Sequence, residues 1–177
     1  MENTLQDNNE EINSSPQEIN FLSTNKFIFL CIISFGLYQF WWIYKTWKFF
    51  NDKDELDINP ALRSIFSIFF LAGLFKKINN YSIQHSNPQT FSSTLNYIGF
   101  FVLNIFTTNL PDPYWLFSFL TILFLIQPFN SFNYGLKRDP AFKFKEESNH
   151  STRQVVLVIL GSIFWILVLL GLSFPEA

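Results

Sequence analysis

The sequence has few charged residues and no excess of positive charge. Lys, Arg, Asp and Glu make up 15% of the 177 residues, whereas a soluble domain usually carries about 25%. This shortage excludes a disordered chain and argues against an ordinary soluble enzyme. Because the formal net charge is −2, the chain lacks the basic surface with which nucleic-acid-binding proteins collect phosphates. We therefore expect no nucleic-acid partner.

Residues that commonly bind metals or form crosslinks are also scarce. The single cysteine, Cys31, excludes an intrachain disulfide and a cysteine-based metal site. The two histidines, His85 and His150, lie in predicted loops without a neighbouring histidine or cysteine. We expect both to be solvated side chains, and we predict no metal and no cofactor.

Apolar residues, in contrast, are abundant and lie in long uncharged runs. Hydrophobic residues make up 49% of the chain, and 24 residues are Phe. A helix needs roughly 20 apolar residues to cross the hydrocarbon core of a bilayer, which is about 30 Å thick. Four segments reach this length, and they predict an all-α, polytopic membrane helix bundle with spans at about 27–47, 91–110, 113–134 and 154–174.

A fifth apolar segment, at about 60–83, is too short to cross. It has only 12 uncharged residues, Ser64 to Phe75, which as a helix reach about 18 Å. Short cytoplasmic loops are enriched in Lys and Arg. If this segment does not cross, the two sides of the membrane hold 11 and 1 basic residues, and if it does cross they hold 8 and 4. We therefore predict a re-entrant or interfacial helix on the cytoplasmic side, with both termini outside. Five spans with the N-terminus inside are the alternative.

The chain divides into a tail and a membrane domain. Residues 1–25 contain five acidic and no basic residues, which predicts a disordered acidic tail, and residues 26–177 form the membrane domain. Helix starts are marked by Asn59 before Pro60, by Asp112 before Pro113 and by a capping box from Ser151 to Gln154.

Uncharged polar residues form two stripes at helical spacing. We expect these stripes to face each other or the interior of the bundle. Interhelical hydrogen bonding is the simpler interpretation, and a polar lining for a solute path or a lipid headgroup is the alternative. The stripes consist of Tyr97, Asn104 and Thr108, and of Gln127, Asn130, Asn133 and Tyr134.

Aromatic and basic residues gather at the predicted cytoplasmic ends of the spans. Trp and Tyr rings close to ammonium groups are typical of an anchoring belt at the membrane surface. This belt comprises Tyr38, Trp41, Trp42, Tyr44 and Trp47, followed by Lys45 and Lys48. The later loop, with Lys143 and Lys145 alternating with Phe142 and Phe144, is suited to contact with anionic lipid.

Two runs carry a resemblance to a known family. ISFGLYQFWWIYKTWKFF (Ile33 to Phe50) and NPALRSIFSIFFLAGLFKKI (Asn59 to Ile78) resemble a family of small bacterial multi-pass membrane proteins of unknown function. The resemblance implies a bacterial inner-membrane location and carries over no activity. It nominates Gly36, Tyr38, Trp42, Tyr44, Arg63, Gln127 and Asn130 as candidate functional or packing positions, to which the polar stripe adds Asn104.

The function expected from these observations is non-enzymatic. No ionisable residue falls in the interior of the four predicted spans, where such residues usually mark proton relays and catalytic sites. We expect a structural or accessory subunit of the inner membrane that contacts the lipid bilayer and either further copies of itself or another membrane protein. A subunit of a small transporter or channel is the alternative, and a lipid-acting enzyme is a third interpretation.

Overall fold

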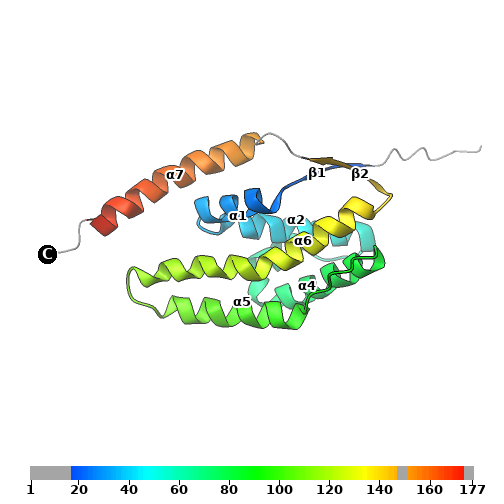
Figure 1. Cartoon of the computed structure of the whole chain (residues 1–177), viewed down its shortest axis with the longest axis horizontal. Helices are drawn as coiled ribbons and strands as arrows, with labels where there is room; N and C mark the ends of the chain where they lie inside the picture. Colours follow the sequence, from blue (N-terminus) through cyan, green and yellow to red (C-terminus); the bar gives the residue numbers. More distant parts are fainter. Residues whose placement is uncertain (1–16, 147–150, 174–177) are drawn as a thin grey trace, which may run out of the picture.

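The chain is mostly helical, as the sequence predicts. The computed structural model describes residues 17–146 and 151–173, in which helices pack as a bundle with one small sheet at its edge (Figure 1). The elements are β1 (Gln17–Phe21), α1 (Thr24–Ile33), α2 (Leu37–Asp54), α3 (Pro60–Ile65), α4 (Ser67–Gln84), α5 (Ser93–Thr108), the 3₁₀ helix η1 (Tyr114–Ile122), α6 (Leu123–Arg138), β2 (Phe142–Glu146) and α7 (Thr152–Ser173).

The predicted first span, 27–47, is a helical hairpin and not one crossing helix. Gly36 has φ +83°, and its N–H donates to the carbonyl of Cys31 at 2.8 Å, which ends α1. The chain then reverses, so the ring centroid of Phe27 in α1 lies 5.6 Å from that of Trp42 in α2. In one straight helix these residues would be about 22 Å apart. The left-handed backbone at Phe35 (φ 52°) and Gly36 is the physical reason for this correction.

The segment predicted to be re-entrant forms a second hairpin, α3 and α4. Asn59 caps α3, because its Oδ1 accepts hydrogen bonds from the N–H groups of Ala61 and Leu62 at 3.0 and 3.2 Å. The helix breaks at Phe66 (φ −90°, ψ 37°), before α4. The Arg63 guanidinium lies 4.6 Å from the Trp47 ring, so α3 packs along α2.

The next unit is an antiparallel pair in which α5 packs on η1 and α6 (Figure 1). Together η1 and α6 form one helix, Tyr114–Arg138, that is long and apolar enough to cross a membrane. Asp112 is not its cap. The Tyr114 N–H bonds to the Pro111 carbonyl at 2.9 Å, and the residue before the helix is Pro113, whose side chain forms no capping hydrogen bond.

The final helix, α7, is the second one that is long and apolar enough to cross a membrane. It begins with the predicted capping box: Ser151 N–H donates to Gln154 Oε1 at 3.1 Å, and Gln154 N–H donates to Ser151 Oγ at 3.4 Å. It packs on α1 and leaves most of its surface exposed, along the edge of the bundle (Figure 1).

A parallel pair of strands, β1 and β2, was not predicted. Gln17 to Phe21 pair with Phe142 to Glu146 in register, so part of the predicted disordered tail is a strand, and residues 1–16 lie outside the described residues. Backbone hydrogen bonds to β2 order this segment, which has too little apolar surface to order itself. The pairing brings the segment before α1 beside the segment that follows α6.

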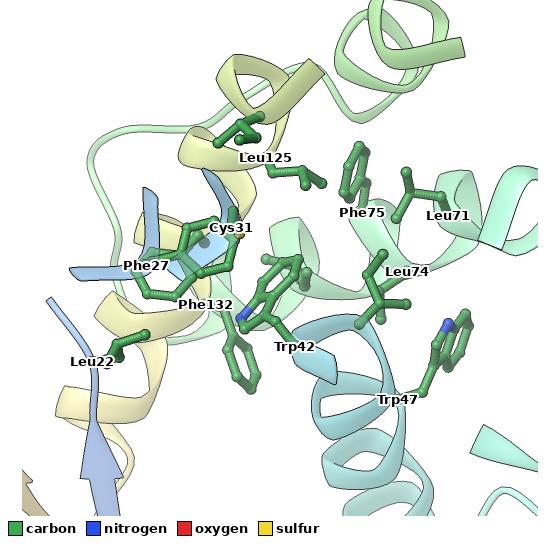
Figure 2. Close-up of a cluster of buried hydrophobic side chains, with 14 of the residues drawn as sticks. Leu22, Phe27, Cys31, Trp42, Trp47, Leu71, Leu74, Phe75, Leu125 and Phe132 are labelled. Atoms are coloured by element: carbon green, nitrogen blue, oxygen red, sulfur yellow. The ribbon is translucent and has the colours of Figure 1, made fainter. Parts of the chain in front are cut away.

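The apolar core joins both hairpins to α6. Phe27 of α1, Leu71 and Phe75 of α4 and Leu125 of α6 have no exposed surface. Figure 2 shows Phe27 beside the α6 ribbon, and its ring stacks on that of Phe129 with centroids 4.2 Å apart. The hairpins are thus integral parts of the bundle.

We expect Gly36→Ala to reduce stability by about 1–2 kcal/mol, because a left-handed backbone places the new Cβ against the following carbonyl. The Cβ would also lie 3.2 Å from Gln39 Nε2. Chemical unfolding in detergent micelles measures this change. Gly73→Ala is the control, since that site is helical and its nearest neighbour is a Trp47 ring atom at 3.9 Å. Equal stability of the two variants would contradict the role of Gly36.

Candidate functional site

A polar cluster lies where α2, α4 and α6 end together. The Asp139 carboxylate, directly after α6, has only 5% of its side chain exposed. Its Oδ2 lies 2.6 Å from Lys53 Nζ, accepts a hydrogen bond from the Tyr81 hydroxyl at 2.9 Å and lies 3.6 Å from His85 Nε2. One carboxylate therefore connects three helices.

Helix geometry brings these side chains together. Lys53 lies in the last turn of α2. Tyr81 and His85 are four residues apart, so they share one face of α4 and its end. Asp139 is the residue that ends α6, and its Oδ1 accepts a hydrogen bond from the N–H of Ala141 at 3.1 Å. The cluster forms because the three helices end at the same level of the bundle.

Three aromatic rings lie close to the ammonium group of Lys53. Its Nζ lies 5.8 Å from the Phe49 ring, 5.0 Å from the Tyr81 ring and 5.9 Å from the Phe142 ring. These distances are within the range of cation–π attraction. The Lys53 side chain is still 33% exposed, so the rings supplement its ion pair with Asp139 without shielding the ammonium group completely from water.

The surroundings of Asp139 favour its charged form. Burial is the largest single influence and raises the pKa of the Asp139 carboxyl, but the hydrogen bonds from Lys53, the Ala141 N–H and the Tyr81 hydroxyl, together with the charge of Lys53, outweigh it. The net result is a pKa below the ordinary value of 3.8. Asp139 is therefore a fixed anion at neutral pH, suited to holding Lys53 and not to exchanging protons.

The cluster corrects one sequence-based expectation. His85 was expected to be solvated, but its side chain is only 17% exposed, and its Nδ1 lies 2.8 Å from the Tyr81 carbonyl. The Tyr81 ring lies beside the His85 ring at a tilted angle, with ring centroids 4.5 Å apart. Within residues 17–146 and 151–173, no three His, Cys, Asp or Glu side chains gather as metal ligands would. The cluster around Asp139 therefore fits a structural contact that joins the ends of α2, α4 and α6.

The candidate positions in the first hairpin and in α3 make contacts with neighbouring side chains. Gly36 forms the turn. The rings of Tyr38 and Trp42 lie 6.2 and 5.6 Å from the Phe27 ring. Tyr44 lies beside Trp41, with ring centroids 5.5 Å apart, and the Arg63 guanidinium lies over Trp47. The structure does not gather these residues into one site.

In the described residues, Gln127 and Asn130 of the second polar stripe are exposed, and each bonds to a residue outside the first stripe. Asn96 Nδ2 donates to Gln127 Oε1 at 3.1 Å, joining α5 to α6, and Thr24 Oγ1 donates to Asn130 Oδ1 at 2.6 Å, joining α1 to α6. The Asn104 side chain is half-buried and, within the part of the chain that the structure describes, forms no hydrogen bond. The bonded pairs favour interhelical packing over a continuous polar path.

Sequence reasoning missed the polar cluster. Lys53 and Tyr81 are 86 and 58 positions from Asp139, and no local spacing connects them. The alternating run at 142–146 was the available signal, since alternation of apolar and polar residues is typical of a strand. Had that strand been predicted, Asp139 would have been placed between it and α6.

A model of a protein family matches residues 22–126, which is more than half of the chain, and its description is "Domain of unknown function (DUF4234)". The chain belongs to the DUF4234 family. This agrees with the resemblance to a family of unknown function. The DUF4234 segment runs from just before α1 into α6, so it contains both hairpins but not Asp139 or α7. No curated protein and no solved structure matches the chain.

Within the DUF4234 segment, we expect Asn96→Leu to cost about 1 kcal/mol of stability, because it leaves the Gln127 amide without its partner. Gln127→Leu should cost a similar amount, and the double variant should cost clearly less than the sum of the two. A double-mutant cycle in detergent-mediated unfolding measures this coupling. Strictly additive effects would contradict the pairing of Asn96 with Gln127.

Proposed function

We propose that this DUF4234 protein is a non-enzymatic integral protein of the bacterial inner membrane and acts there as a structural or accessory subunit. In this proposal α5, the continuous helix of η1 and α6, and α7 each cross the membrane. The hairpins α1–α2 and α3–α4 enter from the cytoplasmic side and return to it. The N-terminus then lies in the cytoplasm and the end of α7 lies outside.

Contacts between the helix ends carry this proposal. The ion pairs Lys53–Asp139 at 2.6 Å and Lys77–Asp54 at 2.7 Å join the last turn of α2 to the residue after α6 and to α4. The pairing of β1 with β2 adds the segment before α1 to the same end. If the segments joined by these contacts lie on one side of the membrane, three helices are left to cross it: α5, the continuous helix of η1 and α6, and α7.

The charge distribution supports the same topology. All 12 Lys and Arg residues precede residue 78 or fall within 137–153, and none lies in 78–136 or after 153. Three crossings therefore leave all 12 on one side. Because short cytoplasmic loops are enriched in Lys and Arg, that side is the cytoplasm. This distribution is more uneven than the 11 and 1 of the four-span arrangement.

The exposed apolar surface supports insertion into a bilayer. Large apolar side chains cover the outer face of α5, including Leu95, Val102 and Phe106, which are 57–68% exposed. Most of α7 is similarly exposed. A contiguous apolar surface of this kind is unfavourable in water and favourable against lipid chains or a membrane partner.

An accessory role fits the polar groups better than transport or catalysis does. The Asn96–Gln127 and Thr24–Asn130 bonds join helices to one another, and the charged cluster is satisfied by its own members. A transport path needs polar groups that face a solute, and hydrolysis needs a nucleophile beside a base. Helix contacts and the cytoplasmic face are therefore the surfaces through which we expect the protein to act.

Labelling of single cysteines in intact cells with a membrane-impermeant reagent tests the topology. The four sites are Asn25, Asp57, Asp112 and Ser173, which are all exposed, in a Cys31→Ala background. We expect labelling at positions 112 and 173 only, and labelling of positions 25 and 57 once the cells are permeabilised. The permeabilised sample is the control for reactivity.

The alternatives predict different patterns at the same four sites. Four spans with the N-terminus outside would add labelling at position 25. Five spans would add labelling at position 57 and leave position 25 protected. Either pattern, or protection of positions 112 and 173, would overturn the proposed topology.

A further inference from the structure

An apolar groove runs between α2 and α3. It has a volume of about 320 Å³ and is lined by Leu37, Phe40, Trp41, Tyr44 and Ser64. The four residues from α2 lie on one face because Phe40, Trp41 and Tyr44 follow Leu37 by three, four and seven residues. Leu37, Phe40 and Trp41 are 67%, 41% and 40% exposed, so nothing within the described chain fills the groove.

The groove has one apolar end and one cationic end. Leu37 follows the hairpin turn, where Phe35 packs on Phe164 and Trp165 near the middle of α7, with ring centroids 4.6 Å away in each case. Tyr44 lies about 10 Å further along α2, towards the first turn of α7. The groove is therefore aligned with α7, from its middle to its N-terminal end.

Two cations flank Trp41 at the second end. Lys45 Nζ lies 5.4 Å from the centre of the Trp41 ring, and the Arg153 guanidinium lies 5.9 Å from it. Both side chains are exposed. Among the described residues, no carboxylate lies within ion-pair distance of either, whereas Lys53 and Lys77 are paired with aspartates. This end of the groove is thus a site of unbalanced positive charge.

We propose that the groove binds one anionic phospholipid. An acyl chain lies along Leu37 and Phe40, and the phosphate lies between Lys45 and Arg153 at the level of Trp41. The positive charge of Lys45 and Arg153 is complementary to an anionic headgroup. In the proposed membrane placement, the apolar part of the groove at Leu37 and Phe40 lies at the depth of the acyl chains. The inference rests on the proposed membrane placement, in which the start of α7 lies at the cytoplasmic headgroups.

Titration of the purified full chain with phosphatidylglycerol, followed by native mass spectrometry, tests the proposal. We expect retention of one phosphatidylglycerol in preference to phosphatidylcholine, and no competition by inorganic phosphate. The variant K45Q/R153Q should bind phosphatidylglycerol about 30-fold more weakly, because each basic side chain near an anionic headgroup contributes about fivefold. The matched control K48Q/K76Q removes the same charge from exposed positions outside the groove and should bind as the wild type does.

Each remaining outcome would overturn the proposal. An equal loss in both double variants would indicate diffuse attraction to charge. Equal retention of phosphatidylcholine by the wild-type protein would show that the cations do not select the ligand, and this comparison needs no variant. Displacement by inorganic phosphate would indicate an anion site without an acyl chain. Because these measurements use purified protein, their failure is distinguishable from a failure of the topology, which the labelling experiment tests in cells.

Discussion

Asp139→Ala is expected to lower the free energy of unfolding by about 3 kcal/mol. The substitution removes the only carboxylate that the described structure provides for Lys53 and also a hydrogen-bond acceptor of the Tyr81 hydroxyl. Removing one partner of a buried ion pair costs about 3–5 kcal/mol, and partial exposure of Lys53 favours the lower end. Unfolding in mixed micelles, followed by helix content, measures the change.

The matched control is Asp54→Ala. Asp54 pairs with Lys77 at a similar distance, but both side chains are more than one-third exposed, and exposed pairs contribute less than about 1 kcal/mol. If Asp139→Ala lowered the free energy of unfolding no more than Asp54→Ala does, the cluster around Asp139 would not stabilise the packing of α2, α4 and α6.

The same cluster predicts a dependence of stability on pH. The pKa of Asp139 is lower in the folded protein than its ordinary value of 3.8. Its stabilising contribution is therefore complete above that ordinary value and is lost as the pH falls through the lower, folded-state pKa. The wild-type protein should lose stability in this acidic range, and Asp139→Asn should lose distinctly less. Identical acid profiles would contradict this assignment.

Gly161→Ala is expected to separate α7 from α1 and to cost about 1–3 kcal/mol. A Cβ at position 161 would collide with the backbone carbonyl of Ile33, which cannot rotate away as a side chain can. Inserting a methyl group into a well-packed contact typically costs this amount. The contact includes the hydrogen bond from Trp165 Nε1 to the Ile32 carbonyl at 3.2 Å, so the fluorescence of Trp165 should change as well.

Gly171→Ala provides the control on the same helix. No atom lies within 4 Å of its added Cβ, and alanine is the better helix former by about 1 kcal/mol. We therefore expect unchanged or higher stability there. If both glycines tolerated alanine equally, α7 would not depend on close approach to α1.

Helix positions and caps were largely predictable from local sequence. Asn59 before Pro60, and the reciprocal pair Ser151 and Gln154, mark helix starts that the structure contains. Caps depend on residues at most three positions apart, which a sequence displays directly. Long uncharged runs similarly identify the helix from Tyr114 to Arg138 and α7.

Chain reversal and the polar cluster were not predictable in the same way. The run from 27 to 47 has the composition of a span, and the chain reverses because Gly36 adopts a left-handed conformation inside it. A single glycine in an apolar run is compatible with a continuous helix as well. The partners of Asp139 come from other helices, so their approach depends on packing that no local pattern encodes. Helical spacing nominated Gln127 and Asn130, but their partners Asn96 and Thr24 come from other helices and were not predicted.

The parallel pairing of β1 with β2 sets an order on biosynthesis. At about 5–20 residues per second, roughly 6–24 seconds pass between completion of residue 21 and synthesis of its partner strand at 142–146. During that interval the first strand has no partner, while the segments between them are made and inserted. Pairing is therefore a late event of assembly, because it has to wait until every helix from α1 to α6 has been synthesised.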